Sequence, residues 1–177
     1  MVIWITGLSG SGKTTIAHSL YNKVKSIHPN TVLLDGDIIR KALNHSWGYS
    51  TEERLKGAKH VAGLCAMLDN DGQNVICATM SLFHEIQESN RERFSSLTEV
   101  YLDVTMHALR QRDKKGLYSG VEKGTRNNVV GLDLPFEIPK NPEFFLENDT
   151  KFQLVKNIET LYEYIIENIS PSFSEVK

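Results

Sequence analysis

The sequence predicts an α/β fold in which helices flank a parallel β-sheet, and three observations support this prediction. Short apolar runs alternate along the chain with longer segments of helical period. A glycine-rich segment lies directly between the first apolar run and the first helical segment. The 177 residues, 40% hydrophobic and 24% charged, can bury a substantial core without disulfides or structural metal. We therefore expect one domain covering residues 1–177.

Each apolar run is short enough for a strand, and each periodic segment is long enough for a crossover helix. The first run, Val-Ile-Trp-Ile, is rich in β-branched residues, and an amphipathic stretch follows the glycine-rich segment. The expected strands are, in order, residues 2–6, 31–34, 74–78, 99–104 and 144–146. The expected helices are residues 13–26, 51–68, 85–94, 106–112 and 152–167.

The last expected helix carries an apolar stripe along its length, and we expect this stripe to pack against the sheet. The stripe consists of Phe152, Val155, Ile158, Leu161, Ile165 and Ile166.

The glycine-rich segment fills every fixed position of the phosphate-binding pattern GxxxxGK[ST], which makes the expected core that of a P-loop NTPase. Backbone N–H groups of such a loop point at phosphate oxygens, and the following helix adds the positive end of its dipole. Lys13 can reach the β and γ phosphates of a nucleoside triphosphate, and the Thr14 hydroxyl can hold Mg²⁺. The expected ATP-binding residues here are Gly7, Leu8, Ser9, Gly10, Ser11, Gly12, Lys13, Thr14 and Thr15.

Two carboxylates and an arginine follow the second expected strand, at the sheet edge where open α/β folds bind ligands. Asp37 can accept a proton from an attacking hydroxyl, and Asp35 can help to position that hydroxyl or the Mg²⁺ shell. Arg40 can pair with an anionic acceptor. The alternative is structural, since Asp37 also stands where it could cap the next helix.

Residues 112–140 break the alternating pattern, with few large apolar residues and many glycines, lysines and prolines. The segment is too long for an ordinary surface connection. In a phosphoryl-transfer enzyme such a segment is a candidate lid that excludes water. The alternative is a solvated loop.

Four segments together resemble the adenylylsulfate kinase family: the loop GLSGSGKT, the strand end LDGDxxR, and the segments QRDKKGLY and GLDLPFEIPKNPE. The last two are far more specific than the phosphate loop. The resemblance implies transfer of the γ-phosphoryl group of MgATP to the ribose 3′-hydroxyl of adenylylsulfate, a step of sulfate assimilation.

The resemblance also implies roles for individual residues. Asp37 matches the general base and Asp35 its companion, and Lys13 completes the catalytic set. Arg112 and Asp113 lie where the lid is anchored near the donor phosphates. The positions expected to bind the acceptor are Asp37, Arg40, Tyr49, Arg54, Met80, Ser81, Lys115 and Val129.

The departures from the family pattern cluster on the acceptor side. Ile38 and Gly57 each replace an asparagine, Val129 replaces a base-stacking phenylalanine, and residues 79–84 lack a proline and an arginine. Ser81 matches a serine that accepts phosphate in the family, although a structural role is the simpler interpretation. The alternative acceptor is therefore another nucleotide, such as cytidine diphosphoramidate in surface-sugar modification. A weaker alternative is a non-catalytic ATP-binding regulator.

The overall charge offers no support for a nucleic-acid or membrane partner, because the net charge is −2 and no basic cluster is present. Cys65 and Cys77 lie in apolar surroundings and are expected to be buried thiols. We expect a cytoplasmic enzyme with a small nucleotide acceptor. The resemblance also allows a homodimer, as relatives often form one.

Overall fold

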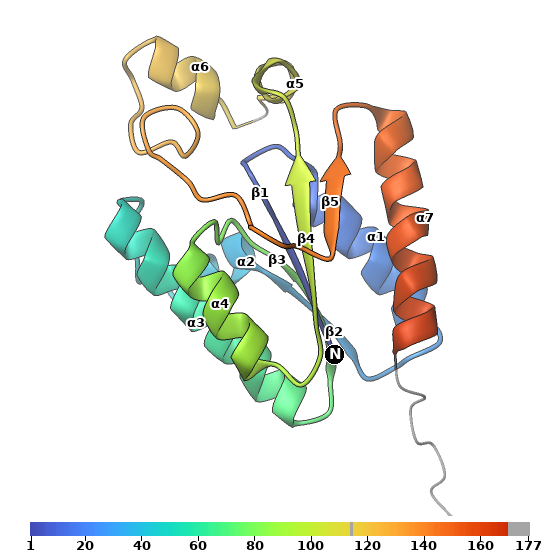
Figure 1. Ribbon diagram of the computed structural model, residues 1–177. Helices are drawn as coiled ribbons and strands as arrows, with labels where there is room; N and C mark the ends of the chain where they lie inside the picture. Colours follow the sequence, from blue (N-terminus) through green and yellow to red (C-terminus); the bar gives the residue numbers. More distant parts are fainter. Residues whose placement is uncertain (114, 170–177) are drawn as a thin grey trace, which may run out of the picture.

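The computed structural model describes residues 1–113 and 115–169, and its centre is a five-stranded parallel sheet (Figure 1). The strand order is β2-β3-β1-β4-β5. The strands are β1 (Val2–Gly7), β2 (Thr31–Asp35), β3 (Asn74–Ala78), β4 (Leu97–Asp103) and β5 (Phe144–Glu147). The expected parallel sheet is confirmed. Because the chain winds from β1 first to one side and then to the other, the carboxyl end of β1 lies at a topological switch point.

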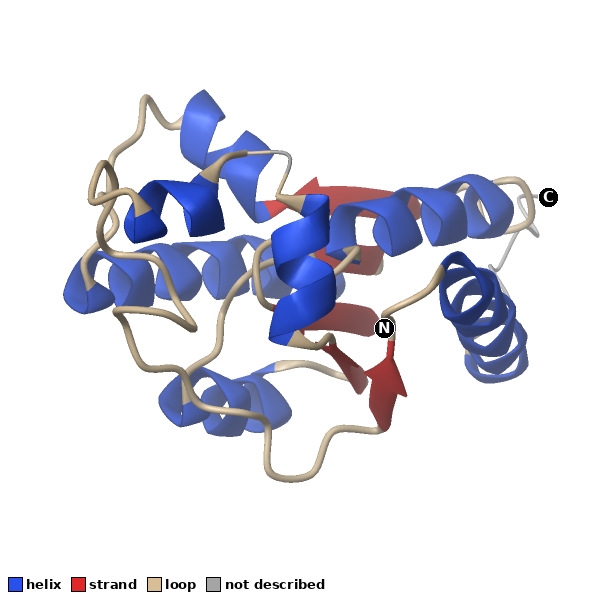
Figure 2. Cartoon of the chain, turned by 90° about the horizontal axis from the view of Figure 1, so that it is seen from above, coloured by secondary structure: helices blue, strands red, loops and turns tan. Residues whose placement is uncertain are grey.

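Helices cover both faces of this sheet, as the view from above makes plain (Figure 2). The five helices expected from the periodicity are present within a few residues of their expected bounds. Two further short helices, of seven and six residues, were not expected from the sequence. The helices are α1 (Lys13–Lys25), α2 (Gly36–Ala42), α3 (Thr51–Asn70), α4 (His84–Arg93), α5 (Met106–Arg112), α6 (Leu117–Glu122) and α7 (Lys151–Asn168).

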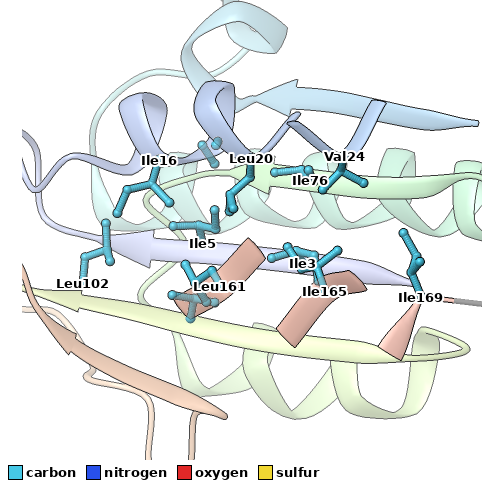
Figure 3. Packing of buried hydrophobic residues seen from close by; sticks show 13 residues of the cluster. Ile3, Ile5, Ile16, Leu20, Val24, Ile76, Leu102, Leu161, Ile165 and Ile169 are labelled. Atoms are coloured by element: carbon cyan, nitrogen blue, oxygen red, sulfur yellow. The ribbon is translucent and has the colours of Figure 1, made fainter. Parts of the chain in front are cut away.

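Two apolar clusters hold the helices to the sheet. On one face, Ile3 and Ile5 of β1 pack with Leu20 of α1 and Leu161 of α7 (Figure 3). On the other face, Trp4 belongs to a cluster that α3 and α4 complete. Every side chain of β1 is buried, which explains why its sequence is a continuous apolar run. A strand clamped in this way holds the phosphate loop at its end in a fixed place.

The apolar stripe of α7 is displaced from the one expected. Phe152 and Val155 are 78% and 59% exposed, so the prediction that they pack against the sheet is wrong. The helix instead turns Leu154, Ile158, Leu161 and Ile165 toward the core. Both stripes fit helical spacing, and only the position of α1 decides which of them is covered.

A third apolar cluster lies at the carboxyl edge of the sheet, where it joins the segment after α5 to the rest of the fold. It contains Leu8, Leu82, Leu109, Tyr118 and Val129. Figure 1 shows α5 and α6 beyond the carboxyl ends of the strands. None of the described helices is long and apolar enough to cross a membrane.

Candidate active site

The phosphate loop folds as its glycines predict. Gly7 and Gly12 have φ values of 146° and 103°, which only glycine adopts readily. The loop closes around the side chain of Lys13, whose Nζ donates to the carbonyl oxygens of Gly7 at 2.8 Å and of Leu8 at 2.7 Å. Residues 13–15 form the first turn of α1, and their N–H groups have no helical partner. This geometry is a site for phosphate.

Burial lowers the pKa of Lys13 from its ordinary value to about 8, although the neighbouring Asp37 acts in the opposite direction. The charged form of a buried lysine is penalised because it has lost water, and an anion placed against it restores that form. The lysine is therefore prepared for a negatively charged ligand.

Three side chains from distant elements fix the backbone of the phosphate loop. Asn148, 1% exposed at the end of β5, donates to the carbonyl oxygen of Ser11 at 2.7 Å. The hydroxyl of Tyr118 donates to the carbonyl oxygen of Ser9 at 2.7 Å, and Arg112 donates to that of Gly10 at 3.2 Å. Of these three residues, the sequence predicted only Arg112 to lie near the phosphate loop. Asn148 gave no signal beyond following a strand, and Tyr118 lies in a motif without an assigned role.

The second strand ends in a carboxylate that joins the loop to the next helix. One oxygen of Asp35 accepts the Thr14 hydroxyl at 2.7 Å. The other accepts the backbone N–H groups of Asp37 and Ile38, so Asp35 is the N-cap of α2. The alternative that Asp37 caps a helix is therefore wrong, because Asp37 lies in the first turn. A hydroxyl and a carboxylate side by side are the hard oxygen ligands that Mg²⁺ prefers, so this pair fits the ion that the family implies.

The Asp37 side chain is exposed to solvent and forms an ion pair with Lys115, which lies in the segment after α5. Its carboxylate accepts from Nζ of Lys115 at 2.5 Å, and both side chains are more than half exposed. Loss of water alone would raise the pKa of Asp37, but the charges of Lys115, Lys13 and Arg40 outweigh this effect and lower it. An ionised carboxylate can accept a proton from a substrate hydroxyl.

Two arginines and a tyrosine form a compact group beside Asp37. The guanidinium of Arg40 lies 3.6 Å from the centre of the Tyr49 ring, and that of Arg54 lies 5.3 Å from it. Nε of Arg54 donates to the carbonyl oxygen of Tyr49 at 2.8 Å. Burial, and then repulsion from Arg40, lower the pKa of Arg54. Two adjacent like charges of this kind favour an anionic ligand.

The remaining expected acceptor residues are less accessible. Met80 lines a small hollow with Arg54 and Val130. Val129 is 5% exposed and packs in the third apolar cluster, so its neighbour Val130 faces the hollow in its place. Ser81 is fully buried, and its hydroxyl has no hydrogen-bond partner among the described residues. The structure brings Met80 to the acceptor side and places the side chains of Ser81 and Val129 behind the surface.

The segment 112–140 contacts both halves of the site. Arg112 and Tyr118 contact the phosphate loop, whereas Lys115 contacts Asp37 and the carbonyl oxygen of Asn128 accepts from Arg54 at 2.9 Å. Asp113 accepts the N–H groups at the start of α6. The segment therefore connects the two halves, and its closure as a lid stays a prediction.

Near its end, this segment forms hydrogen bonds with the first residue of α4. The backbone N–H of His84 donates to the carboxylate of Glu137, and its ring nitrogen Nε2 lies 2.9 Å from the carbonyl oxygen of Ile138. Both contacts of His84 therefore join the start of α4 to residues 137 and 138.

The structure thus assembles a phosphate loop, a metal-compatible oxygen pair, an exposed carboxylate and a group of cations at one sheet edge. A family model described as adenylylsulphate kinase matches residues 1–147 of the chain.

Individual relatives include enzymes with different acceptors in their names. A cytidine diphosphoramidate kinase of Campylobacter jejuni is 38% identical over 160 residues, which cover 90% of this chain and 93% of the relative. An adenylyl-sulfate kinase of Picosynechococcus is 33% identical over 167 residues, or 94% of each chain. Among solved structures, the Mycobacterium tuberculosis APS kinase CysC in complex with AMPPNP and APS has a TM-score of 0.85 at 27% identity. It covers 93% of this chain and 96% of that one.

Proposed function

The chain belongs to the adenylylsulfate kinase family, and on this premise we propose that it transfers the γ-phosphoryl group of ATP to a nucleotide's ribose 3′-hydroxyl. The observation that carries the proposal is the double role of Asp35. One of its oxygens binds Thr14 of the phosphate loop, and the other binds the backbone of Asp37. This carboxylate therefore links the donor site to the candidate base.

In the proposed reaction, the phosphate loop and Lys13 hold the triphosphate of ATP. Thr14 and Asp35 would hold Mg²⁺, which would supply charge neutralisation on the phosphate oxygens. Asp37 accepts the proton of the attacking 3′-hydroxyl. Lys115, whose Nζ contacts the base Asp37, stabilises negative charge in the transition state. Arg40 and Arg54 bind the anionic 5′ substituent of the acceptor.

We propose cytidine diphosphoramidate as the first acceptor. Val129 is buried and its neighbour Val130 faces the hollow beside Arg54, so a large purine gains no stacking surface from position 129. The 38% identical relative named for this acceptor also matches the chain over almost its whole length. Adenylylsulfate is the second candidate, because the family model and other relatives carry its name.

The test compares kcat/KM for the two acceptors with MgATP under identical conditions. We expect kcat/KM to be higher for cytidine diphosphoramidate, or to differ only slightly between the two acceptors. A strong preference for adenylylsulfate would overturn the acceptor proposal and leave the kinase proposal intact. Tight ATP binding without turnover of any nucleotide acceptor would instead favour the regulator. With adenylylsulfate the reaction would belong to sulfate assimilation, and with the cytidine nucleotide to surface-sugar modification.

Two further expectations stay predictions. A cytoplasmic location is tested by fractionation of the source cell, and a homodimer by sedimentation of the purified protein.

A further inference from the structure

The loop between α2 and α3 has one buried side chain. Among residues 41–50, all of which the structure describes, Trp47 alone is buried, and it is 8% exposed. Asn44 and His45 in the same loop have φ values of 52° and 54°, which are unfavourable for residues with a side chain. The buried indole of Trp47 anchors this loop to the fold.

The indole rests directly on the backbone of α3 at Gly57. A Cβ built on Gly57 would lie 2.6 Å from Cε2 and 2.7 Å from Cδ1 of Trp47, which is closer than real atoms approach. The ring also lies 5.5 Å from the ring of His60, one helical turn further along. No side chain fits at position 57 while Trp47 keeps its place, so the two residues form a complementary pair.

The anchored loop orients both arginines of the acceptor side through its backbone. The carbonyl oxygen of Trp47 accepts Nε of Arg40 at 3.0 Å. Two residues later, the carbonyl oxygen of Tyr49 accepts Nε of Arg54 at 2.8 Å. The ring of Tyr49 in turn lies under the Arg40 guanidinium. A shift of Trp47 would therefore move the partners of both guanidinium groups together.

We propose that Trp47 and Gly57 form a lock that positions Arg40 and Arg54, and that residue 57 thereby determines acceptor selectivity. Glycine at this position admits the indole, which is buried in the apolar cluster of α3 and α4. A polar side chain at 57 would displace the ring and could itself donate to the acceptor. The proposal rests on the proposed function, in which these arginines bind the acceptor's anionic group.

The variant Gly57→Ala tests the lock, and Gly63→Ala is its matched control. Both glycines lie inside α3, so the change in helix propensity is the same, but a Cβ at Gly63 meets nothing within 4 Å. We expect Gly57→Ala to raise the acceptor KM about 10- to 100-fold, as small displacements of binding groups do, with the ATP KM unchanged. Gly63→Ala should change neither constant.

A double-mutant cycle separates the contact from a general loss of stability. In a Trp47→Ala background the indole is gone, so the further change Gly57→Ala should have no effect on acceptor KM. We also expect Gly57→Asn to shift the ratio of kcat/KM between adenylylsulfate and cytidine diphosphoramidate, whereas Gly63→Asn should not.

The outcomes distinguish this inference from the proposed function. If the wild type phosphorylates an acceptor but Gly57→Ala behaves like Gly63→Ala, the lock is overturned and the kinase stands. Equal effects of Gly57→Ala with and without Trp47 would also overturn it. A wild type that phosphorylates no nucleotide overturns the proposed function itself.

Discussion

The donor half and the acceptor half of the site are built in different ways. The donor half is a backbone structure: Lys13, Asn148, Tyr118 and Arg112 all bond to carbonyl oxygens of the phosphate loop. In the acceptor half the functional groups are side chains, such as Asp37 paired with Lys115 and Arg40 stacked on Tyr49. These side chains come from α2, the loop between α2 and α3, and the segment after α5.

This difference explains where the chain departs from its family. A backbone cradle tolerates few changes because each glycine is required by a φ value or a close approach. A pocket of side chains can change its ligand through single substitutions, such as Gly57 or Val129. The donor half is that of a kinase, and we expect changes in the acceptor half to alter the choice of acceptor. Five predictions test this division.

The largest effect is expected in the donor half, from Lys13→Ala. Loss of the only lysine in the phosphate loop removes charge stabilisation from the transferred group, so kcat/KM should fall about 10³-fold or more. Steady-state assays with each acceptor measure it. The fall should be the same for both acceptors, and a fall limited to one of them would break the division into halves.

The second-largest effect is expected from a change at Asp37, the proposed base. Asp37→Asn keeps the size of the side chain but cannot accept the proton, so kcat should fall about 10²- to 10⁴-fold while ATP binding persists. Calorimetric titration with a non-hydrolysed ATP analogue checks the binding. A wild-type kcat in this variant would remove Asp37 as the base.

A pair of arginine variants compares the halves directly. Arg54→Ala removes a charged donor from the acceptor side, so acceptor KM should rise about 10- to 100-fold with little change in ATP KM. Arg112→Ala should produce the opposite pattern, because Arg112 bonds to the phosphate loop. Equal effects of both variants on both KM values would contradict the separation.

The lowered pKa of Lys13 predicts a pH dependence confined to the donor half. Free enzyme loses this proton as the pH rises through about 8. Bound triphosphate favours the charged form, so ATP binding at pH 9 should take up about one proton, and affinity should fall with rising pH. Calorimetry in buffers of different ionisation enthalpy measures the uptake. Lys13→Ala should abolish it, whereas uptake that persists in this variant would assign it elsewhere.

The smallest effect is expected from Tyr118→Phe. The variant keeps the buried ring but loses one hydrogen bond to the carbonyl oxygen of Ser9, so ATP KM should rise about 2- to 10-fold. Burial raises the pKa of this hydroxyl to about 12, so it remains a donor across the range of the assay. An unchanged ATP KM would mean that the loop holds its shape without this contact.

Much of the fold could be predicted because its signals are local. The apolar runs of β1 and β3 and the period of α3 are properties of consecutive residues, and they placed the parallel sheet correctly. The stripe of α7 was right at Ile158, Leu161 and Ile165 but wrong at Phe152 and Val155, because helical spacing also allows Leu154 to face the core. The helix α2 was missed since its signal is one capping carboxylate, which was assigned to catalysis.

The residues of the site also fall into those that could be predicted from local sequence and those that could not. By itself, the sequence determined the phosphate loop and the family, because Gly7 to Thr14 are contiguous and the required conformation follows from glycine, lysine and threonine alone. Only the tertiary structure decided that Asn148 and Tyr118 support this loop and that Trp47 occupies the space above Gly57. Such contacts join residues separated by 10 to 137 positions, and their geometry depends on how the helices pack on the sheet. For that reason the donor site can be predicted from one motif, whereas the shape of the acceptor site depends on the packing of several elements.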